Sequence, residues 1–305
     1  MQNKLEVSVG IPAFNEEANI RNLLESLLSQ RGENFVLKEI IVFSDGSTDK
    51  TVERAKEISD ARIKILDNKE RVGNAAGQNR ILEIFSGDVL ILLNADVLPS
   101  NDKFIPSILE PFYREGGIGI VGGMPVPIHA ENIFEKIINY SVEIKKYIYA
   151  NINNGHNLYA CHGRVRAFSK DFARKFRWNP DVAIAEDSFS YLACIKNGYK
   201  FYYQPSAQVL YKSPQNFKDH AKQSIRYFHG RSILKKYFDN NLIKQSYFIP
   251  RALLIRSLFY FFIKNPFLFL SYFYILLFSK LRSYFMKTTS VQWSPSETSK
   301  VIYDK

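Results

Sequence analysis

Five acidic side chains of this 305-residue chain stand where a carboxylate can do chemistry. Glu16, Asp45 and Asp96 each lie in a polar loop that follows an apolar run, and Glu186 and Asp187 begin a predicted helix. A carboxylate placed in this way can accept a hydrogen bond from a nucleobase, ligate a hard divalent cation or take a proton from a hydroxyl. The pattern therefore indicates a nucleotide and metal site built from carboxylates, next to a general base.

The elements that must position these side chains alternate between strand and helix over the first hundred residues. The predicted strands cover residues 5–11, 39–43, 62–66 and 88–93, and the predicted helices cover residues 20–28, 51–58 and 73–85. Strands that are apolar at nearly every position and separated by helices indicate a parallel sheet covered on both faces. We expect an α/β domain in which the loops after the first, second and fourth strands form one rim.

The pattern loosens after residue 98. We expect a helix over 103–114, a strand over 118–124, a helix over 133–149, a sheet-pairing segment within 158–168, a helix over 186–197, a β-ribbon over 199–211 broken at Pro205, and a basic helix past Pro214.

Several familiar site patterns are missing from the sequence. It has no G-x-G-x-x-G fingerprint and no G-x-x-x-x-G-K-[ST] loop, which disfavours nicotinamide cofactors and P-loop chemistry. Its two cysteines, Cys161 and Cys194, are too few for a disulfide scaffold or a zinc-finger framework, and we expect both to be buried. Residues 1–5 lack a signal pattern, so we expect the body to stay in a reducing cytosol.

The net charge of +11 is unevenly distributed along the chain. Residues 1–195 carry 23 basic and 26 acidic side chains, whereas residues 196–305 carry 18 basic and 4 acidic ones. Within the basic part, residues 257–279 are almost wholly apolar and rich in Phe, Tyr and Leu. Such a segment with basic flanks is typical of a membrane anchor. We therefore expect a membrane partner and no nucleic acid.

Six short motifs follow one another along residues 7–230. They are P-A-F-N-E at 12–16, S-D-G-S-T-D at 44–49, G-N-A-A-G-Q-N at 73–79, N-A-D at 94–96, E-D at 186–187 and Q-S-I-R-Y at 223–227. In this order and spacing they resemble the motifs of family-two glycosyltransferases with the GT-A fold. The resemblance implies a mostly parallel central sheet with helices on both faces, followed by C-terminal membrane-associated helices.

The resemblance also implies a domain organisation and partners. Residues 1–240 would form the catalytic domain, with a nucleotide-sugar-binding half over 1–98 and an acceptor-binding half over 99–240, and residues 241–305 would form membrane-associated helices with a polar tail. The donor would be a nucleotide sugar, with a UDP-sugar favoured and a GDP-sugar as the alternative. The acceptor would be a lipid-linked or other glycan at the cytoplasmic side of the cell membrane, in surface polysaccharide or glycoconjugate assembly.

The family implies donor-binding roles for six residues. Pro12, Phe14 and Glu16 would line the nucleoside, and Asp45 would accept a hydrogen bond from the base. Asn94 would contact the donor, and Asp96 would also ligate the Mg²⁺ or Mn²⁺ ion that holds the donor diphosphate.

The catalytic and acceptor roles fall on the later motifs. Asp187 would be the general base that deprotonates the acceptor hydroxyl, and in-line attack by that hydroxyl would invert the anomeric centre. Glu186, Gln223, Arg226 and Tyr227 would lie near the acceptor and the diphosphate, although a carboxylate at a helix start such as Glu186 is also what helix stability alone favours.

Three positions depart from the usual family pattern. Asn94 stands where the first aspartate of the D-x-D signature is usual, so Asp96 would hold the metal with less help. Tyr227 replaces the tryptophan of processive synthases. Lys212 stands where many relatives have a histidine, so a histidine contact with the donor is not expected there.

The tail and the chemistry each leave alternatives open. The Pro266 region breaks the apolar segment. This favours two short helices that lie in the membrane interface or dip into it as a hairpin, over a single tilted span, a soluble core segment or a dimer interface. A polyprenyl phosphate acceptor would be ionised already and would not need Asp187. A catalytically lapsed nucleotide-binding scaffold protein is the alternative outside enzymes, suggested by Asn94.

Overall fold

The computed structural model describes residues 4–179, 182, 184–285 and 302, without the side chains of residues 222, 225–229 and 282–285. Its centre is one eight-stranded sheet with the strand order β3-β2-β1-β4-β7-β6-β8-β5. The strands are β1 (Leu5–Ala13), β2 (Phe35–Asp45), β3 (Ile63–Asn68), β4 (Val89–Leu93), β5 (Leu98–Pro99), β6 (Ile118–Pro127), β7 (Val165–Ser169) and β8 (Lys200–Tyr211).

The sheet has two parts that differ in strand direction. In the first part β3, β2, β1 and β4 are all parallel, with Val9 paired to Ile40 and to Ile91. In the second part β7 runs antiparallel to both β4 and β6, while β6 and β8 are parallel to each other. The expected α/β sheet is therefore present, and its second half is mixed.

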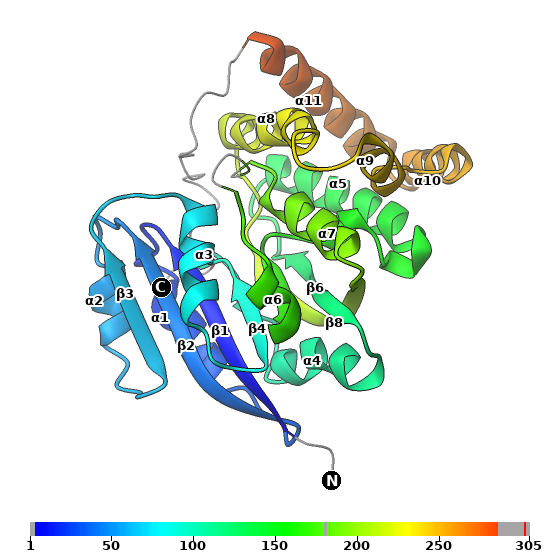
Figure 1. Cartoon of the computed structure of the whole chain (residues 1–305). Coiled ribbons are helices and arrows are strands. Elements are labelled where there is room, and N and C mark those ends of the chain that lie inside the picture. Colours follow the sequence, from blue (N-terminus) through cyan, green and yellow to red (C-terminus); the bar gives the residue numbers. More distant parts are fainter. Residues whose placement is uncertain (1–3, 180–181, 183, 286–301, 303–305) are drawn as a thin grey trace.

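Helices cover both faces of this sheet (Figure 1). The helices before the C-terminal part are α1 (Ile20–Leu28), α2 (Thr51–Lys56), α3 (Asn74–Ile84), α4 (Phe104–Arg114), α5 (Ile133–Ala150), α6 (Lys170–Lys175) and α7 (Glu186–Lys196), with short 3₁₀ turns at Asn153–Gly155 and Leu158–Ala160. The C-terminal helices are α8 (Phe217–Leu234), α9 (Asn240–Ser246), α10 (Arg251–Lys264) and α11 (Pro266–Phe285).

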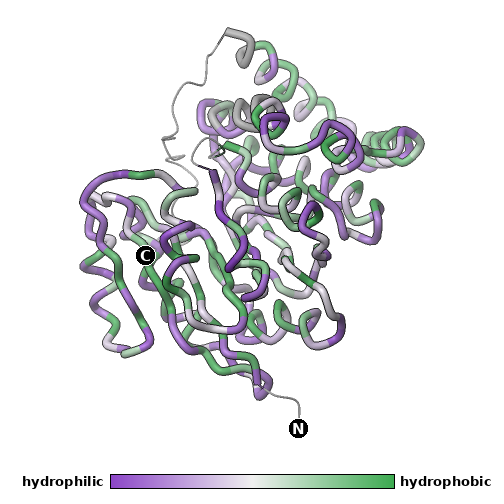
Figure 2. The backbone as a smooth tube through the Cα atoms, in the orientation of Figure 1, coloured by the Kyte–Doolittle hydropathy of each residue, from purple (hydrophilic) through white to green (hydrophobic). Residues whose placement is uncertain are grey.

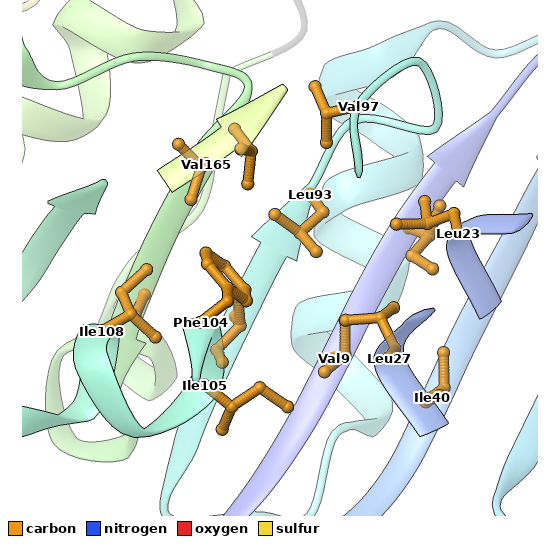
Figure 3. Close-up of a cluster of buried hydrophobic side chains, with 14 of the residues drawn as sticks. Val9, Leu23, Leu27, Ile40, Leu93, Val97, Phe104, Ile105, Ile108 and Val165 are labelled. Carbon is orange, nitrogen blue, oxygen red and sulfur yellow. The ribbon is translucent and has the colours of Figure 1, made fainter. Parts of the chain in front are cut away.

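Two apolar clusters hold these layers together. On one face, Leu23 and Leu27 of α1 pack over Val9 and Ile40, and α4 places its own side chains over β4 and β7 (Figure 3). On the other face, α3, α6 and α7 contribute to a second cluster, which also contains both cysteines. The two clusters fix the sheet between its helices, so the strand ends and their loops have one geometry.

Two of the expected elements differ from what the structure shows. The segment over 199–211 is a single strand, β8. Tyr203 pairs with Gly122 and Gln208 with Met124, so the register with β6 shifts across Pro205 and its neighbours. β2 begins at Phe35, four residues before the predicted strand, because Phe35 and Leu37 are buried against the first cluster. The burial of Cys161 and Cys194 is as expected.

Among the C-terminal helices, α10 and α11 pack against α5, and α11 also contacts α8 (Figure 1). The helical conformation is interrupted at Asn265, between α10 and α11, as predicted from Pro266. α11 is largely hydrophobic along its length (Figure 2). The stretch Asn240–Lys264, which contains α9 and α10, is the one described segment that is long and apolar enough to cross a membrane by length and composition.

Candidate active site

A pocket opens at the carboxyl ends of β1, β2 and β4, where the parallel half of the sheet ends. Its lining comprises Pro12, Ala13, Phe14, Glu16, Phe43, Asp45, Arg71, Gly73, Asn74, Gly77, Asn94, Ala95 and Asp96. All six residues predicted to bind the donor are in this lining. The geometric expectation that the three loops form one rim is therefore confirmed, whereas the role of each side chain stays a prediction.

The loops after β1 and β2 are joined by hydrogen bonds. The Asn15 backbone has a φ of 53° and its side-chain Oδ1 accepts from the Thr48 backbone N–H at 2.8 Å. The Glu16 backbone N–H donates to Thr51 Oγ1 at 2.7 Å, and the Glu16 carboxylate accepts from the Asn19 amide at 2.9 Å. The two loops are thus one unit, and Glu16 is held at its edge before any ligand binds.

Asp45 ends β2 and is buried beneath the loop that enters α3. Its two carboxylate oxygens accept from the backbone N–H groups of Val72 and Gly73, at 2.6 and 2.9 Å. The next residue, Gly46, has a φ of 68°, and a Cβ added there would lie 2.9 Å from the backbone nitrogen of Arg71. A carboxylate can accept about four hydrogen bonds, so Asp45 retains acceptor capacity for a ligand.

Arg71 is a pocket residue that the sequence reasoning missed. Its guanidinium lies 3.8 Å from the centroid of the Phe14 ring, an arrangement typical of cation–π contact. The two side chains form a flat wall beside Asp45. The only signal in the sequence was a single basic residue two positions before Gly73, which is too weak to separate from an exposed loop residue.

Asp96 and Asn94 follow β4 at the opposite side of the pocket. The Asp96 Oδ1 atom is buried and has no hydrogen-bond partner among the described residues. An unpartnered buried carboxylate oxygen fits a hard cation, which prefers oxygen ligands. The residues of the described chain include no group of three or more His, Cys, Asp or Glu side chains able to hold a metal.

The start of α7 adjoins the pocket through Glu186. Its carboxylate Oε2 accepts from Asn74 Nδ2 at 2.6 Å and from Gln78 Nε2 at 2.9 Å, and Asn74 also lines the pocket. Asp187 is the next residue, half-buried, and its Oδ1 accepts from the backbone N–H of Ser188 at 2.6 Å. Glu186 thus has structural contacts, and Asp187 follows a residue that is hydrogen-bonded to the pocket residue Asn74.

The remaining predicted site residues lie on α8. The backbone of Gln223, Arg226 and Tyr227 is helical, and the side chains of Arg226 and Tyr227 lie outside the described residues. A Cβ added to Gly230 on the same helix would lie 3.1 Å from the Ala185 Cβ. α8 therefore passes beside the residue that precedes α7.

The structure also defines the surroundings of Lys212 and His162. The ammonium group of Lys212 is buried and paired with the Glu131 carboxylate at 2.8 and 3.0 Å. Burial, with the nearby charges of Arg164 and Arg166, lowers the pKa of His162 to about 4, so its imidazole is neutral at pH 7. A neutral His162 cannot offset the negative charge of a diphosphate.

Relatives of the chain include proteins with known activity. It is 29% identical over 257 residues to the dolichyl N-acetyl-alpha-D-glucosaminyl phosphate 3-beta-D-2,3-diacetamido-2,3-dideoxy-beta-D-glucuronosyltransferase of Methanococcus voltae, covering 76% of this chain and 75% of that protein. It is 23% identical to the poly-beta-1,6-N-acetyl-D-glucosamine synthase of Staphylococcus aureus, covering 77% of this chain and 57% of that longer protein.

The fold is similar to that of solved glycosyltransferases. The mannosyltransferase PcManGT from Pyrobaculum calidifontis, solved with GDP-Man and Mn²⁺, superposes with a TM-score of 0.58 at 18% identity, covering 91% of this chain and 76% of that one. The arrangement of sheet and helices is thus the GT-A fold. The sequence model of Glycosyl transferase family 2 matches residues 8–177, more than half of the chain. The resemblance found in the motifs is therefore confirmed, and the chain belongs to glycosyl transferase family 2.

Proposed function

We propose that this protein is an inverting, metal-dependent glycosyltransferase that moves a sugar from a nucleotide-diphosphate donor to a hydroxyl of a membrane-held, lipid-linked glycan. The observation that carries the proposal is the pocket in which Asp45 and Asp96 lie together, whose lining residue Asn74 is hydrogen-bonded to Glu186, the residue before Asp187. The relative in Methanococcus voltae, which by its name acts on a dolichyl-linked sugar phosphate, supports this class of acceptor.

The donor would lie across the rim of the parallel half-sheet. The base would contact Asp45, which has acceptor capacity left, and would lie against the flat wall of Phe14 and Arg71. Asp96, with Asn94 beside it, would hold a Mg²⁺ or Mn²⁺ ion that neutralises charge on the diphosphate. Structures of similar fold were solved with GDP-Man and Mn²⁺ and with UDP and Mg²⁺, which supports a nucleoside diphosphate without choosing the base.

The transfer needs one base and one leaving group. The acceptor hydroxyl oxygen forms a bond to the anomeric carbon while the bond from that carbon to the diphosphate oxygen breaks. The hydroxyl proton passes to the Asp187 carboxylate, and the electron pair leaves with the nucleoside diphosphate. Gln223, Arg226 and Tyr227 on α8 would border the acceptor and the diphosphate, with Arg226 offsetting charge on the leaving group.

An outer apolar surface on α10 and α11 would hold the protein at a membrane. The inner faces of both helices pack on α5, while large apolar side chains on their outer faces are exposed. The most exposed are Ile255, Phe259, Ile263, Phe267, Leu270, Tyr274 and Leu277. We call this set the outer apolar surface. A soluble protein rarely exposes so many large apolar side chains together.

Basic residues accompany the outer apolar surface. Arg251 and Arg256 on α10 and Lys280 on α11 are exposed. Lys264 also pairs with Glu143 of α5 at 3.1 Å, which fastens the end of α10 to the body. Helices with one face on the body and the other apolar and flanked by positive charge suit an interface-lying hairpin on an anionic cytoplasmic leaflet. The lipid-linked acceptor would be presented at this surface.

The test is a donor assay on the full chain in detergent. UDP- and GDP-sugars would be screened with Mn²⁺ for thermal stabilisation, and release of nucleoside diphosphate would then be measured with a membrane lipid extract as the source of acceptor. We expect Asp96→Ala to lose more than about 10²-fold in turnover, because several kcal/mol of charge stabilisation disappear. Asp187→Asn should lose about 10²- to 10⁴-fold in transfer while still binding the nucleotide.

Asp67→Asn is the matched control, since Asp67 lies one residue before the end of β3 on the same half-sheet but is absent from the pocket lining. Its turnover should equal that of the unsubstituted protein. Nearly full activity in Asp187→Asn would overturn the hydroxyl acceptor and favour a phosphate. Equal donor binding and turnover with and without Asp96 would overturn the metal-dependent transferase.

A further inference from the structure

Arg166 is a charged side chain that the mechanism above does not use. It lies on β7 with 0% of its side chain exposed, between the sheet and the helices α3 and α7. Its guanidinium also lies 5.3 Å from the centroid of the Trp178 ring. A buried guanidinium is costly to desolvate, so a folded protein that retains one has partners that compensate for the loss of water.

The partners of Arg166 come from both sides of the candidate active site. One terminal nitrogen donates to Gln78 Oε1 of α3 at 3.0 Å, and the other donates to Ser190 Oγ of α7 at 2.9 Å. The guanidinium also lies 3.7 Å from the Glu186 carboxylate and donates to the Glu186 backbone carbonyl at 3.4 Å. One side chain therefore links the helix behind the donor pocket to the first turn of the helix that carries Asp187.

The first turn of α7 has other restraints besides Arg166. Asn74 and Gln78 of α3 donate to the Glu186 carboxylate at 2.6 and 2.9 Å, and the Tyr247 hydroxyl donates to Ser188 Oγ at 3.1 Å. The N-cap position of α7 is Ala185, which has no side chain able to cap the helix. Trp178 Nε1 donates to the Glu186 carbonyl at 2.9 Å, and Ser190 Oγ donates to the Asp187 carbonyl at 2.8 Å. Arg166 therefore contacts two of the groups, Glu186 and Ser190, that flank Asp187 in space.

We propose that Arg166 is the positioning residue for Asp187: its buried guanidinium clamps the first turn of α7 to α3 and so sets where the Asp187 carboxylate stands relative to the donor pocket. The inference rests on the proposed function only for the role of Asp187. The clamp can be tested without an activity assay.

The chemistry of the clamp requires an arginine. A planar guanidinium reaches Gln78 with one nitrogen and Ser190 with the other, whereas a lysine ammonium is a single point on a flexible stem. Arg166→Lys keeps the charge and removes one arm of the clamp. A displacement of the base by about 1 Å can cost about 10²-fold in rate, so the loss should appear in kcat.

The experiment compares hydrogen exchange and kinetics in the full chain in detergent. Mass spectrometry would follow amide exchange in the peptide that covers residues 184–190, with and without UDP and Mn²⁺. In Arg166→Lys we expect exchange in this peptide to quicken at least about tenfold and kcat to fall about 10²-fold, while the KM for the donor changes less than about twofold. Ser190→Ala, which removes one contact, should move both readouts in the same direction by less.

Glu39→Gln is the matched control for general destabilisation. Glu39 is buried on β2, where it accepts from Ser8 and Ser86, far along the chain from α7. This variant should lower the melting temperature but leave exchange over 184–190 and kcat unchanged. Unchanged exchange over 184–190 in both Arg166→Lys and Ser190→Ala would overturn the clamp, as would an equal loss of kcat in Glu39→Gln.

The two proposals fail in different ways. If the unsubstituted protein released no nucleoside diphosphate from any UDP- or GDP-sugar, the proposed function would fail while the exchange data still decided the clamp. If the unsubstituted protein were active and amide exchange over 184–190 were unchanged in Arg166→Lys and Ser190→Ala, only the clamp would be overturned.

Discussion

The pocket at the strand ends and the region around the start of α7 are held together in different ways. In the pocket, the loops after β1 and β2 bond directly to each other and to the loop before α3, through side chains such as Asn15 and Asp45 that belong to the motifs themselves. At the start of α7, the contacts join residues far apart in sequence, as Glu186 does with Asn74 across 112 positions. The pocket loops are therefore restrained by hydrogen bonds among themselves, whereas the start of α7 is restrained by residues of other elements.

Substitutions in the two regions should therefore affect different properties. A substitution in the pocket loops should act locally and change nucleotide binding. A substitution in the core beneath α7, or on the outer face of α10 and α11, should act at a distance and change turnover or membrane association. Three measurements test this distinction.

The largest effect should come from the outer apolar surface. Replacing Ile255, Ile263 and Phe267 together by glutamate removes three exposed apolar side chains and adds three negative charges. Since burying each such side chain is worth about 1.5–3 kcal/mol, co-sedimentation with phosphatidylglycerol-containing vesicles should fall by more than about 10³-fold. Nucleotide binding, measured by thermal stabilisation with UDP and Mn²⁺, should be unchanged.

The matched control for the outer apolar surface is Val36→Glu, at an exposed apolar position on β2. It should bind vesicles like the unsubstituted protein. Equal sedimentation of the triple variant, or equal loss in the control, would contradict the interface-lying hairpin.

A smaller effect concerns acid stability in the parallel half of the sheet. Burial alone would raise the pKa of Glu39, but hydrogen bonds from Lys64, Ser8 and Ser86 outweigh it and lower that pKa from 4.5 to about 2. Because the folded-state pKa is below the unfolded one, this stabilisation is complete above pH 4.5 and disappears as the pH falls towards 2.

The free energy of unfolding, measured with urea, should therefore fall by roughly 3 kcal/mol between pH 7 and pH 2 through Glu39 alone. In Glu39→Gln, the dependence of unfolding free energy on pH across this window should be visibly flatter. An identical slope in both proteins would show that the network around Glu39 does not favour its ionised form.

The smallest effect should come from Gly46→Ala. The φ of 68° and the close approach of the Arg71 backbone leave no room for a Cβ, so the loop must shift at a cost of about 1–3 kcal/mol. UDP affinity, measured by calorimetry with Mn²⁺, should fall about tenfold while vesicle binding is retained. Gly116→Ala is the control, because a Cβ there would meet nothing within 4 Å. Equal UDP affinity in both variants would mean that the loop does not shape the pocket.

The same difference explains what could be predicted from the sequence. The parallel strands and the donor pocket were predictable because Asp45, Asp96 and their neighbours lie directly after apolar strands, and parallel topology brings strand ends to one edge. The break at Asn265 was predictable because Pro266 cannot continue a helix from the preceding residue.

The second, mixed half of the sheet was less predictable for a physical reason. β7 reads as a short apolar segment, and nothing local in its sequence specifies that it inserts antiparallel between β4 and β6. Arg166 on this strand looks like any basic residue beside Arg164 until the fold places Gln78 and Ser190 against it. Arg71 was missed likewise, because its contact with Phe14 depends on two loops meeting.

The packing of α10 and α11 on α5 affects how this protein can be handled. The inner faces of these helices cover Ile137, Ile144 and Ile148, and the Tyr140 hydroxyl donates to the Phe261 carbonyl. Truncation before Arg251 to improve solubility would remove the outer apolar surface but expose the apolar face of α5 that α10 and α11 cover. The hairpin is therefore not a removable module, and mild detergent or a lipid nanodisc should yield more active protein than truncation.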